Sequence, residues 1–420
     1  MAARESFIPL PRHVLLEACL SEKKLLPAQG QAFQNFCQSL SIYYHLKYHS
    51  QNERLKEYFL LLDPEETSYS NTDLDTAKQF IQGFSQLLEN ANFFPLSKEI
   101  LQKAFATESL IALRTEVNFE DFAEVICYCQ GDIFQDIEEK KFFRTVTRQI
   151  DIYERVALLV QFKSADYFKA NKIDPQKLSF KPGKIYISLY KNIPKKDVEF
   201  IFPNVEVNML RRDKLLFWIP AIAAGIPTVL RVVPQLLLIA GVTLFIVFKY
   251  LNIEVNLPQV QPEEVQDVMP VLVAMLSIIL GCGGFAAKQY SNYKFKYIKF
   301  QKEVTDTLFF RNLASNFSVI QLLIDAAEEE QCKEIILVYY FLLQQNQPID
   351  PQTLDQQIEI WVLERFATTI DFDITSTLKA MEKFDGDRPI VTKDETGKYQ
   401  AVPLEMSQAM LRELLTQSFT

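Results

Sequence analysis

VVPQLLLIAGVTLFIVF (residues 232–248) and VMPVLVAMLSIILGCGGFAA (residues 268–287) are apolar stretches without a charged side chain. A helix needs roughly 20 mostly apolar residues to cross a hydrocarbon core of about 30 Å, and both stretches come close to that length. The pattern predicts an integral membrane protein built on a hairpin of transmembrane helices, at 232–250 and 268–287.

Basic residues flank this hairpin on both sides, whereas the acidic loop at 251–267 contains no Lys or Arg. Short translocated loops are depleted in these residues, so we expect the loop outside and both termini on the cytoplasmic side. The preceding segment at 214–231 is also apolar, but Pro220 and Pro227 would interrupt a helix there. We interpret it as an interfacial or re-entrant segment, and a third full span is the alternative.

The residues beside the expected membrane are candidates for contact with lipid headgroups. In the segment at 288–311, aromatic residues recur at helical spacing among lysines, and a basic aromatic juxtamembrane helix attracts anionic lipids. The headgroup candidates are Arg211, Arg212, Lys214, Lys288, Lys294, Lys296, Lys299, Tyr290, Tyr293 and Tyr297. Simple anchoring is the favoured interpretation, and a dedicated lipid site is the alternative. The candidates for close packing of the transmembrane helices are Gly241, Gly281 and Gly284.

Before the hairpin, a change in the spacing of hydrophobic residues divides the chain into two parts. Residues 1–145 predict a helical domain, with an apolar stripe at intervals of three and four formed by Phe80, Phe84, Leu87, Ala91 and Phe94. Asn118 and Gly131 bracket a further predicted helix. Residues 146–213 change to period two and predict a small α+β unit, with strands at 152–163, 185–190 and 205–209 and a short helix from Pro194.

Residues 312–420 predict a winged-helix-like domain. Helices are expected at 331–343, 354–366 and 373–384, followed by a β-hairpin at 389–402. Acids outnumber basic residues by 18 to 8 in this part, so phosphates would be repelled and the wing suits protein contact better than nucleic acid. The expected fold class is α+β, mainly helical, with the transmembrane hairpin between the soluble parts.

No motif for catalysis is present. The chain lacks a P-loop, an H-E-x-x-H zinc motif and a G-x-S-x-G nucleophile, so we predict no catalytic residue, cofactor or metal site. His45 and His49 share a helical spacing that metals use, but surface or packing histidines are the favoured interpretation. Cys127 and Cys129 are interpreted as small buried side chains of a helix. The acidic run Glu328–Glu330 is interpreted as a solvated helix face.

Several segments together resemble a known family. They are KNIPKKDVEFIFPNVEVNM (191–209), FFRNLASNFSVIQLLIDAAEEEQCKEIILVYYFLL (309–343), DFDITSTLKAMEKF (371–384) and GKYQAVPLEMSQAML (397–411). In this order they resemble the uncharacterised transmembrane protein 143-like family (domain of unknown function 3754), over roughly residues 150–415. The resemblance implies membrane residence in bacteria such as cyanobacteria, or in organelles, and brings no catalytic residues.

These observations leave several classes of function open. The leading hypothesis is a membrane-anchored scaffold or assembly factor in a bacterial plasma or thylakoid membrane, or in an organellar inner membrane, binding protein partners on the inner side. The alternative is an oligomer that handles lipids or solutes. An enzyme is the third possibility. Expected partners are membrane lipids and either other proteins or further copies of the chain, and the net charge of −9 argues against nucleic acid.

Overall fold

The computed structural model describes residues 7–66, 74–97, 101, 114–141, 144–208, 308–345, 347–371, 373–386 and 388–417, and scattered helical positions between 283 and 305. The chain forms two compact units. The first combines Met1–Glu108, Val117–Val205 and Leu308–Thr420, and the second combines Ser109–Glu116 and Glu206–Thr307. The helices and the main sheet described below belong to the first unit.

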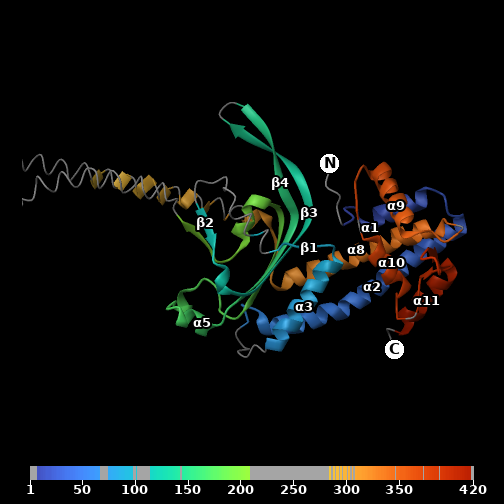
Figure 1. Ribbon diagram of the computed structural model, residues 1–420, viewed down its shortest axis with the longest axis horizontal. Helices are drawn as coiled ribbons and strands as arrows, with labels where there is room; N and C mark the ends of the chain where they lie inside the picture. The colour runs from blue at the N-terminus through green and yellow to red at the C-terminus, as the bar shows by residue number, and fades with distance from the viewer. Residues whose placement is uncertain are drawn as a thin grey trace, which may run out of the picture. The chain divides into compact units, whose positions relative to one another are not determined.

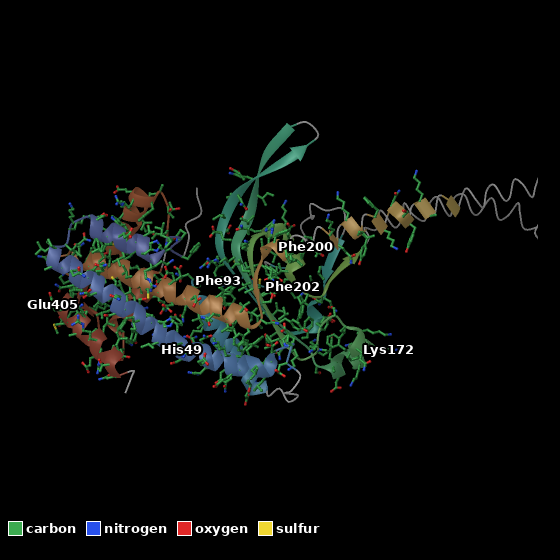
Figure 2. The ribbon with its side chains drawn as sticks, turned by 180° about the vertical axis from the view of Figure 1, so that it is seen from behind. His49, Phe93, Lys172, Phe200, Phe202 and Glu405 are labelled. Carbon is green, nitrogen blue, oxygen red and sulfur yellow. The ribbon has the colours of Figure 1, made fainter. Side chains whose placement is uncertain are left out.

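Helices from both ends of the chain share one apolar core (Figure 1). They are α1 (Arg12–Ser21), α2 (Pro27–Leu62), α3 (Leu74–Asn90), α8 (Phe317–Leu343), α9 (Pro351–Phe366), α10 (Ile374–Glu382) and α11 (Leu404–Gln417). Aromatic rings join the two ends: the ring centroids of Phe36 and Tyr339 are 4.5 Å apart. Helix α11, which carries Glu405, runs along α2, which carries His49 (Figure 2).

Local sequence explains where several of these helices begin. Asp350 caps α9 by accepting a hydrogen bond of 2.9 Å from the backbone N–H of Thr353, and Pro351 occupies the first helical position. Asp373 caps α10 in the same way, accepting from the backbone N–H of Ser376. Such caps satisfy backbone donors that have no partner inside the helix, so they define the helix start.

The main sheet is antiparallel and has five strands in the order β1-β3-β4-β5-β7. Its strands are β1 (Phe94–Pro95), β3 (Phe122–Lys141), β4 (Arg144–Phe162), β5 (Ile185–Pro194) and β7 (Asn312–Ser315). One face contributes Leu159, Ile187 and neighbours to the helical core. The other face forms a second core with Phe168 of α5 (Ala165–Ala170) and Ile201 of the 3-10 helix η3 (Lys195–Ile201). Figure 2 labels Phe93, where the chain passes from α3 into β1.

Two smaller sheets complete the described strands. One pairs β2 (Arg114–Val117) with β6 (Val205–Asn208), and the other pairs β8 (Val391–Lys393) with β9 (Tyr399–Ala401). The strands expected at 152–163, 185–190 and 205–209 are confirmed, as are the helices expected at 331–343, 354–366 and 373–384. The hairpin expected at 389–402 is confirmed too, but Val391 and Tyr399 are buried, so it packs against α8 and does not project as a wing.

The helix predicted between Asn118 and Gly131 is wrong. Asn118 caps only the short 3-10 helix η1 (Phe119–Asp121), after which β3 begins. Cys127 and Cys129 therefore lie on the same face of a strand and are buried in the second core. The sequence predicts a helix end at Gly131, but Gly131 lies inside β3. Pairing of β3 with β4 outweighs the local preference for a helix.

The described residues include no helix that is both long enough and apolar enough to cross a membrane. This finding contradicts the expected fold class with a transmembrane hairpin, and with it the integral, multi-pass membrane protein. The chain is instead a mixture of helices and an antiparallel sheet. The long apolar helix α8 is buried by protein and interrupted by charges such as Glu330 and Lys333. The segments expected at 214–231, 232–250, 251–267 and most of 268–287 lie outside the described residues.

Gly131 occupies a backbone conformation that favours glycine. Its φ is +70°, and a Cβ placed there would lie 2.6 Å from Oε2 and 2.7 Å from Cβ of Glu154 on β4. Gly183 has a similar φ of +79°, but a Cβ there would meet nothing within 4 Å. Substituting alanine at Gly131 and at Gly183 therefore distinguishes the cost of backbone strain from the cost of a steric clash.

We predict that Gly131→Ala lowers the free energy of unfolding by about 2–4 kcal/mol, because it adds a clash with Glu154 to the strain of a positive φ. Gly183→Ala should cost only about 1 kcal/mol, the strain alone. Urea denaturation of both variants measures the difference. Equal losses would show that the contact with Glu154 does not matter.

Candidate functional site

The acidic run on α8 holds other segments in place. Glu328 accepts a hydrogen bond of 3.0 Å from Nδ1 of His45 on α2, and Glu329 accepts one of 2.7 Å from the backbone N–H of Arg12. Glu330 is only 5% exposed. The interpretation of this run as a solvated face is therefore wrong, because its carboxylates point into contacts with the N-terminal part of the chain.

A buried ion pair on α8, between Glu330 and Lys333, binds the segment before α1 at Ile8. We call these three residues the clamp. Nζ of Lys333 lies 2.6 Å from Oε1 of Glu330 and donates a second hydrogen bond of 2.5 Å to the backbone carbonyl of Ile8. Oε2 of Glu330 accepts from the backbone N–H of Ile8 at 3.1 Å. Burial raises the pKa of Glu330, and the charge of Lys333 opposes that rise. The two side chains thus satisfy the backbone N–H and C=O of Ile8, as a neighbouring strand would.

A cleft of about 660 Å³ lies beside this clamp. Its walls are the segment Phe7–Pro11, the start of α8 and the strands β4 and β5. Glu154 and Arg155 face it from the sheet, and Leu322, which is 41% exposed, faces it from α8. Three of its charged residues have partners within the chain, since Glu330 and Lys333 bind each other and Glu329 binds Arg12.

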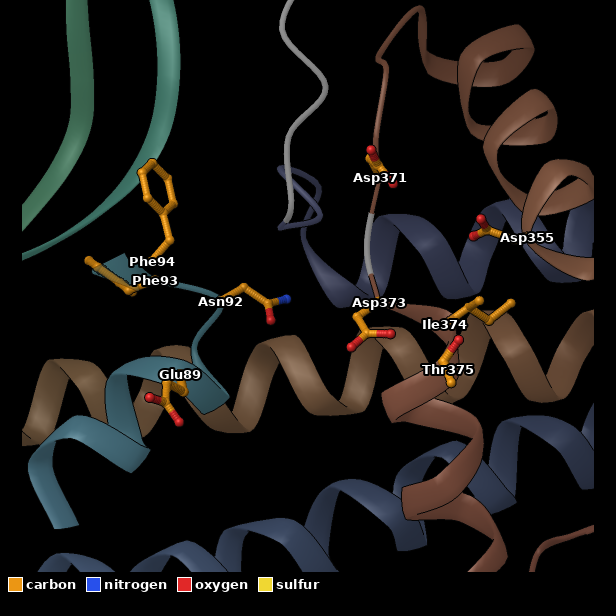
Figure 3. A pocket seen from close by; sticks show the side chains of 9 residues that line it. All are labelled: Glu89, Asn92, Phe93, Phe94, Asp355, Asp371, Asp373, Ile374 and Thr375. Carbon is orange, nitrogen blue, oxygen red and sulfur yellow. The ribbon is translucent and has the colours of Figure 1, made fainter. Parts of the chain in front are cut away.

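A second cavity, of about 560 Å³, is acidic (Figure 3). Asp355 faces it from α9, Asp371 and Asp373 from the segment entering α10, and Glu89 and Asn92 from the end of α3. Among the described residues, no group of three or more His, Cys, Asp or Glu is arranged to hold a metal ion. Asp373 is also occupied as the cap of α10. The carboxylates therefore line the cavity without converging on one point.

Glu334 of α8 binds Asn92, one of the residues that line this acidic cavity. It accepts hydrogen bonds of 2.7 Å from Nδ2 of Asn92 and 2.8 Å from Oγ1 of Thr377. Burial raises the pKa of Glu334 to about 7, and the charges of Glu330 and Asp373 act in the same direction. A carboxyl group with this pKa changes its charge near neutral pH.

The strands β3 and β4 continue beyond the rest of the sheet as a two-stranded ribbon (Figure 1). We call residues 132–151 the β-arm. Strand β1 pairs with β3 only at Tyr128 and Cys129, and β5 pairs with β4 only from Ile152 onward. Within the β-arm, the register runs from Phe134 opposite Asp151 to Lys141 opposite Arg144. Among the described strands, each strand of the β-arm is paired with the other alone.

One lysine fixes the root of the β-arm. Nζ of Lys195, in η3, lies 2.7 Å from Oδ1 of Asp132 on β3 and 3.0 Å from Oδ1 of Asp151 on β4. Burial alone would lower the pKa of Lys195, but its hydrogen bonds and ion pairs with both carboxylates outweigh burial and raise it. The same ammonium lies 5.2 Å from the ring centre of Tyr153. Lys195 thus binds both strands at the root of the β-arm.

The residues proposed for lipid contact and helix packing fall in or near the second unit. Described at helical positions are Gly284, Lys288, Tyr290, Lys294, Tyr297 and Lys299. Tyr290 is 58% exposed, and Tyr297 accepts a hydrogen bond of 3.1 Å from Gln301. The others lie outside the described residues: Arg211, Arg212, Lys214, Gly241, Gly281, Tyr293 and Lys296. Their roles stay predictions.

Sequence reasoning missed both the clamp and the β-arm. For the clamp, a signal existed: Glu330 and Lys333 stand three residues apart, next to the apolar run Ile335–Leu343. For the β-arm, the signal was two consecutive stretches that contain many β-branched and aromatic residues, at 122–141 and 144–162, and the expected helix at 118–131 concealed it.

Comparison with known proteins finds a match for part of the chain. Residues 153–318 match the family model described as "Protein of unknown function (DUF3754)". The matched range begins in β4, includes β5 and β7 and ends at the start of α8. It supports a domain of unknown function in this part of the chain. No solved structure matches the chain.

The buried clamp yields a stability prediction. Lys333→Met should lower the free energy of unfolding by about 3–5 kcal/mol, because it leaves Glu330 buried without a compensating charge. Combining Lys333→Met with Glu330→Gln should recover much of that loss. Lys169→Met removes an exposed pair with Asp166 and should change stability little. Urea denaturation measures all three, and a large loss in the control variant would contradict the argument.

Glu334 yields a pH prediction. Its pKa is about 7 in the folded protein and 4.5 ordinarily, so its stabilising contribution is complete below pH 4.5 and is lost as the pH rises through 7. Glu334→Gln removes this dependence. The difference in free energy of unfolding between wild type and variant should change by about 3 kcal/mol between pH 4.5 and about pH 8. If the free energies of unfolding of wild type and variant, measured by chemical denaturation, changed with pH in parallel, the prediction would be wrong.

Proposed function

We propose that this protein works by self-association, and that the β-arm of one copy pairs with the β-arm of a second copy. The observation that carries the proposal is the length of β3 and β4, 20 and 19 residues, of which only part is paired within the sheet. No catalytic motif falls within residues 132–151 of the sequence, so a contact surface is the use that the β-arm fits best.

Backbone hydrogen bonding favours such a contact. Strand β3 after Gln130 and strand β4 before Ile152 each have one described partner strand. Each therefore presents an open edge of backbone N–H and C=O groups, which pair readily with another strand. A two-stranded ribbon alone is marginally stable in water, and a third and fourth strand would stabilise it.

Side chains of the β-arm add apolar surface. Phe134 is 62% exposed although it is a large aromatic residue in the middle of a strand. Its neighbour across the ladder is Asp151, whose carboxylate is turned to Lys195. Covering Phe134 against another β-arm would remove this surface from water, which favours association.

The charge pattern favours a second copy as the partner. Acids occupy the β-arm part of β3 at Asp136, Glu138 and Glu139, whereas basic residues occupy the end of the ribbon, at Lys140, Lys141 and Arg144. An antiparallel pairing of two β3 edges, with its twofold axis at Glu138, would set Asp136 of each copy opposite Lys140 of the other. These two contacts between opposite charges would outnumber the one contact between like charges, where the two Glu138 residues face each other on the axis. Opposite charges in facing positions stabilise a strand pair, and like charges destabilise it.

A charge swap tests this arrangement in the full chain. We predict that Asp136→Lys and Lys140→Asp each weaken dimerisation by roughly tenfold or more, because each variant creates two like-charge contacts. The double variant Asp136→Lys with Lys140→Asp should restore dimerisation. Light scattering after size-exclusion chromatography, across a range of protein concentrations, measures the mass of each variant.

Asp166→Lys is the matched control, because Asp166 is 92% exposed on α5, away from the β-arm strands. It should leave the mass unchanged. A wild-type chain that is monomeric at every concentration would refute the proposal. A dimer that tolerates both single swaps would place the contact elsewhere.

We also propose that the chain is a member of the transmembrane protein 143-like family. The segments quoted above support this membership, as does the match of residues 153–318 to a domain of unknown function. The family supplies no activity, so the proposed self-association rests on the β-arm alone.

A further inference from the structure

A third cavity lies between α2 and α3, with one residue of α8 at its base, and it has a volume of about 460 Å³. This size falls within the range of roughly 300–1,000 Å³ that small-molecule sites occupy. It is built by helices and shares no residue with the β-arm. It differs from the other two cavities in its chemistry, since no carboxylate lines it.

The cavity is bounded by two polar stripes of the same spacing. On α2 the stripe is Lys47, Gln51, Arg54 and Tyr58, and on α3 it is Gln79, Gly83, Gln86 and Asn90. Both advance by four, three and four residues, so each stripe occupies one face of its helix. The apolar residues Phe80, Phe84 and Leu87 of α3 turn instead into the helical core.

Glycine brings the two stripes close together. A Cβ at Gly83 would lie 2.9 Å from Cδ2 of Leu55 on α2. A larger residue at this position would push the helices apart or fill the cavity. The helices thus approach at one point, and the polar side chains on either side of it line a cavity that is open to solvent.

Two cations, Lys47 and Arg54, line the cavity. Among the described residues, neither Lys47 nor Arg54 has a carboxylate within ion-pair distance or a side-chain hydrogen bond; the Lys47 ammonium lies 5.3 Å from the ring centre of Tyr44. Of the acids around α2, Glu328 binds His45 and Glu53 binds Lys56. Burial lowers the pKa of Lys47, and the charge of Asp385 partly offsets that fall. In a chain of net charge −9, two such cations on one cavity attract an anion.

The remaining lining is neutral and hydrogen-bonding. Carboxamides from Gln51, Gln79, Gln86, Asn90 and Gln331 surround the space. A carboxamide both donates and accepts, which matches the dual character of a hydroxyl group. At the base, the buried Tyr48 adds a phenol beside Asn90. An ordinary solvated helix face would carry charges of both signs, which this one lacks.

We propose that this cavity binds a small phosphorylated polyhydroxy molecule of the sugar phosphate class. Lys47 and Arg54 hold the phosphate, because ammonium and guanidinium groups make strong charge-assisted hydrogen bonds to its oxygens. The carboxamides of Gln79, Gln86 and Asn90 bind the hydroxyl groups. The inference goes beyond self-association and does not depend on it.

Isothermal titration calorimetry of the full chain tests the site with glucose 6-phosphate as the probe. Inorganic phosphate and glucose are titrated separately, because each contains one of the two chemical groups of the probe. We expect saturable binding of glucose 6-phosphate that is tighter than that of inorganic phosphate. Arg54→Gln should weaken it by about tenfold or more, the loss of one charge-assisted hydrogen bond. Gln86→Leu should weaken glucose 6-phosphate but leave inorganic phosphate unchanged.

Arg412→Gln, an exposed arginine on α11, is the matched control and should bind like wild type. Thermal melts followed by circular dichroism check that every variant is folded. Absence of binding by both glucose 6-phosphate and inorganic phosphate in the wild type would overturn the proposal. So would equal affinities for these two probes, or binding that neither Arg54→Gln nor Gln86→Leu weakens.

Discussion

The C-terminal part of helix α8 must be covered on all of its faces, and the rest of the first unit is arranged around that requirement. Its residues Ile335–Leu342 are all buried, so no side of this stretch faces water. The covering elements come from far apart in the chain: α1, α2 and α3 from the N-terminal part, α9 and α10 from the C-terminal part, and strands of the sheet. Burial of such a helix favours folding strongly, but only when these elements assemble together.

The charged residues of α8 make this assembly specific. A helix that is apolar on every side could rotate or slide within its core at small cost. Glu330 and Lys333 prevent this, because a buried charge must keep its partner, and the pair also binds the backbone of Ile8. Glu334 adds a contact with Asn92 at the end of α3 and with Thr377 of α10. These polar contacts therefore set the rotation of α8 and the position of the chain before α1.

The β-arm contrasts with this core. The sheet is covered on both faces where it lies against α8 and against the second core, but the β-arm continues past both. Lys195 and Gly131 lie where the covered part of the hairpin ends, so the direction of the β-arm is defined at its root. The cavity between α2 and α3 shows a related principle: polar stripes stay together between helices when Gly83 permits a close approach.

Local pattern alone determined much of the secondary structure. Helical spacing marked α3, α8, α9 and α10, and alternation marked β4 and β5, because these periods depend on residues close in the sequence. Long-range pairing decided the rest. Residues 122–141 became a strand because β4 lies beside them, and the run Glu328–Glu330 became a set of contacts because Arg12 and His45 reach it. The apolar stretches at 232–248 and 268–287 predicted a membrane hairpin, whereas the long apolar helix that the structure describes, α8, is buried by protein. Apolar composition determines that a segment avoids water, but tertiary structure decides what covers it, since protein and lipid exclude water equally well.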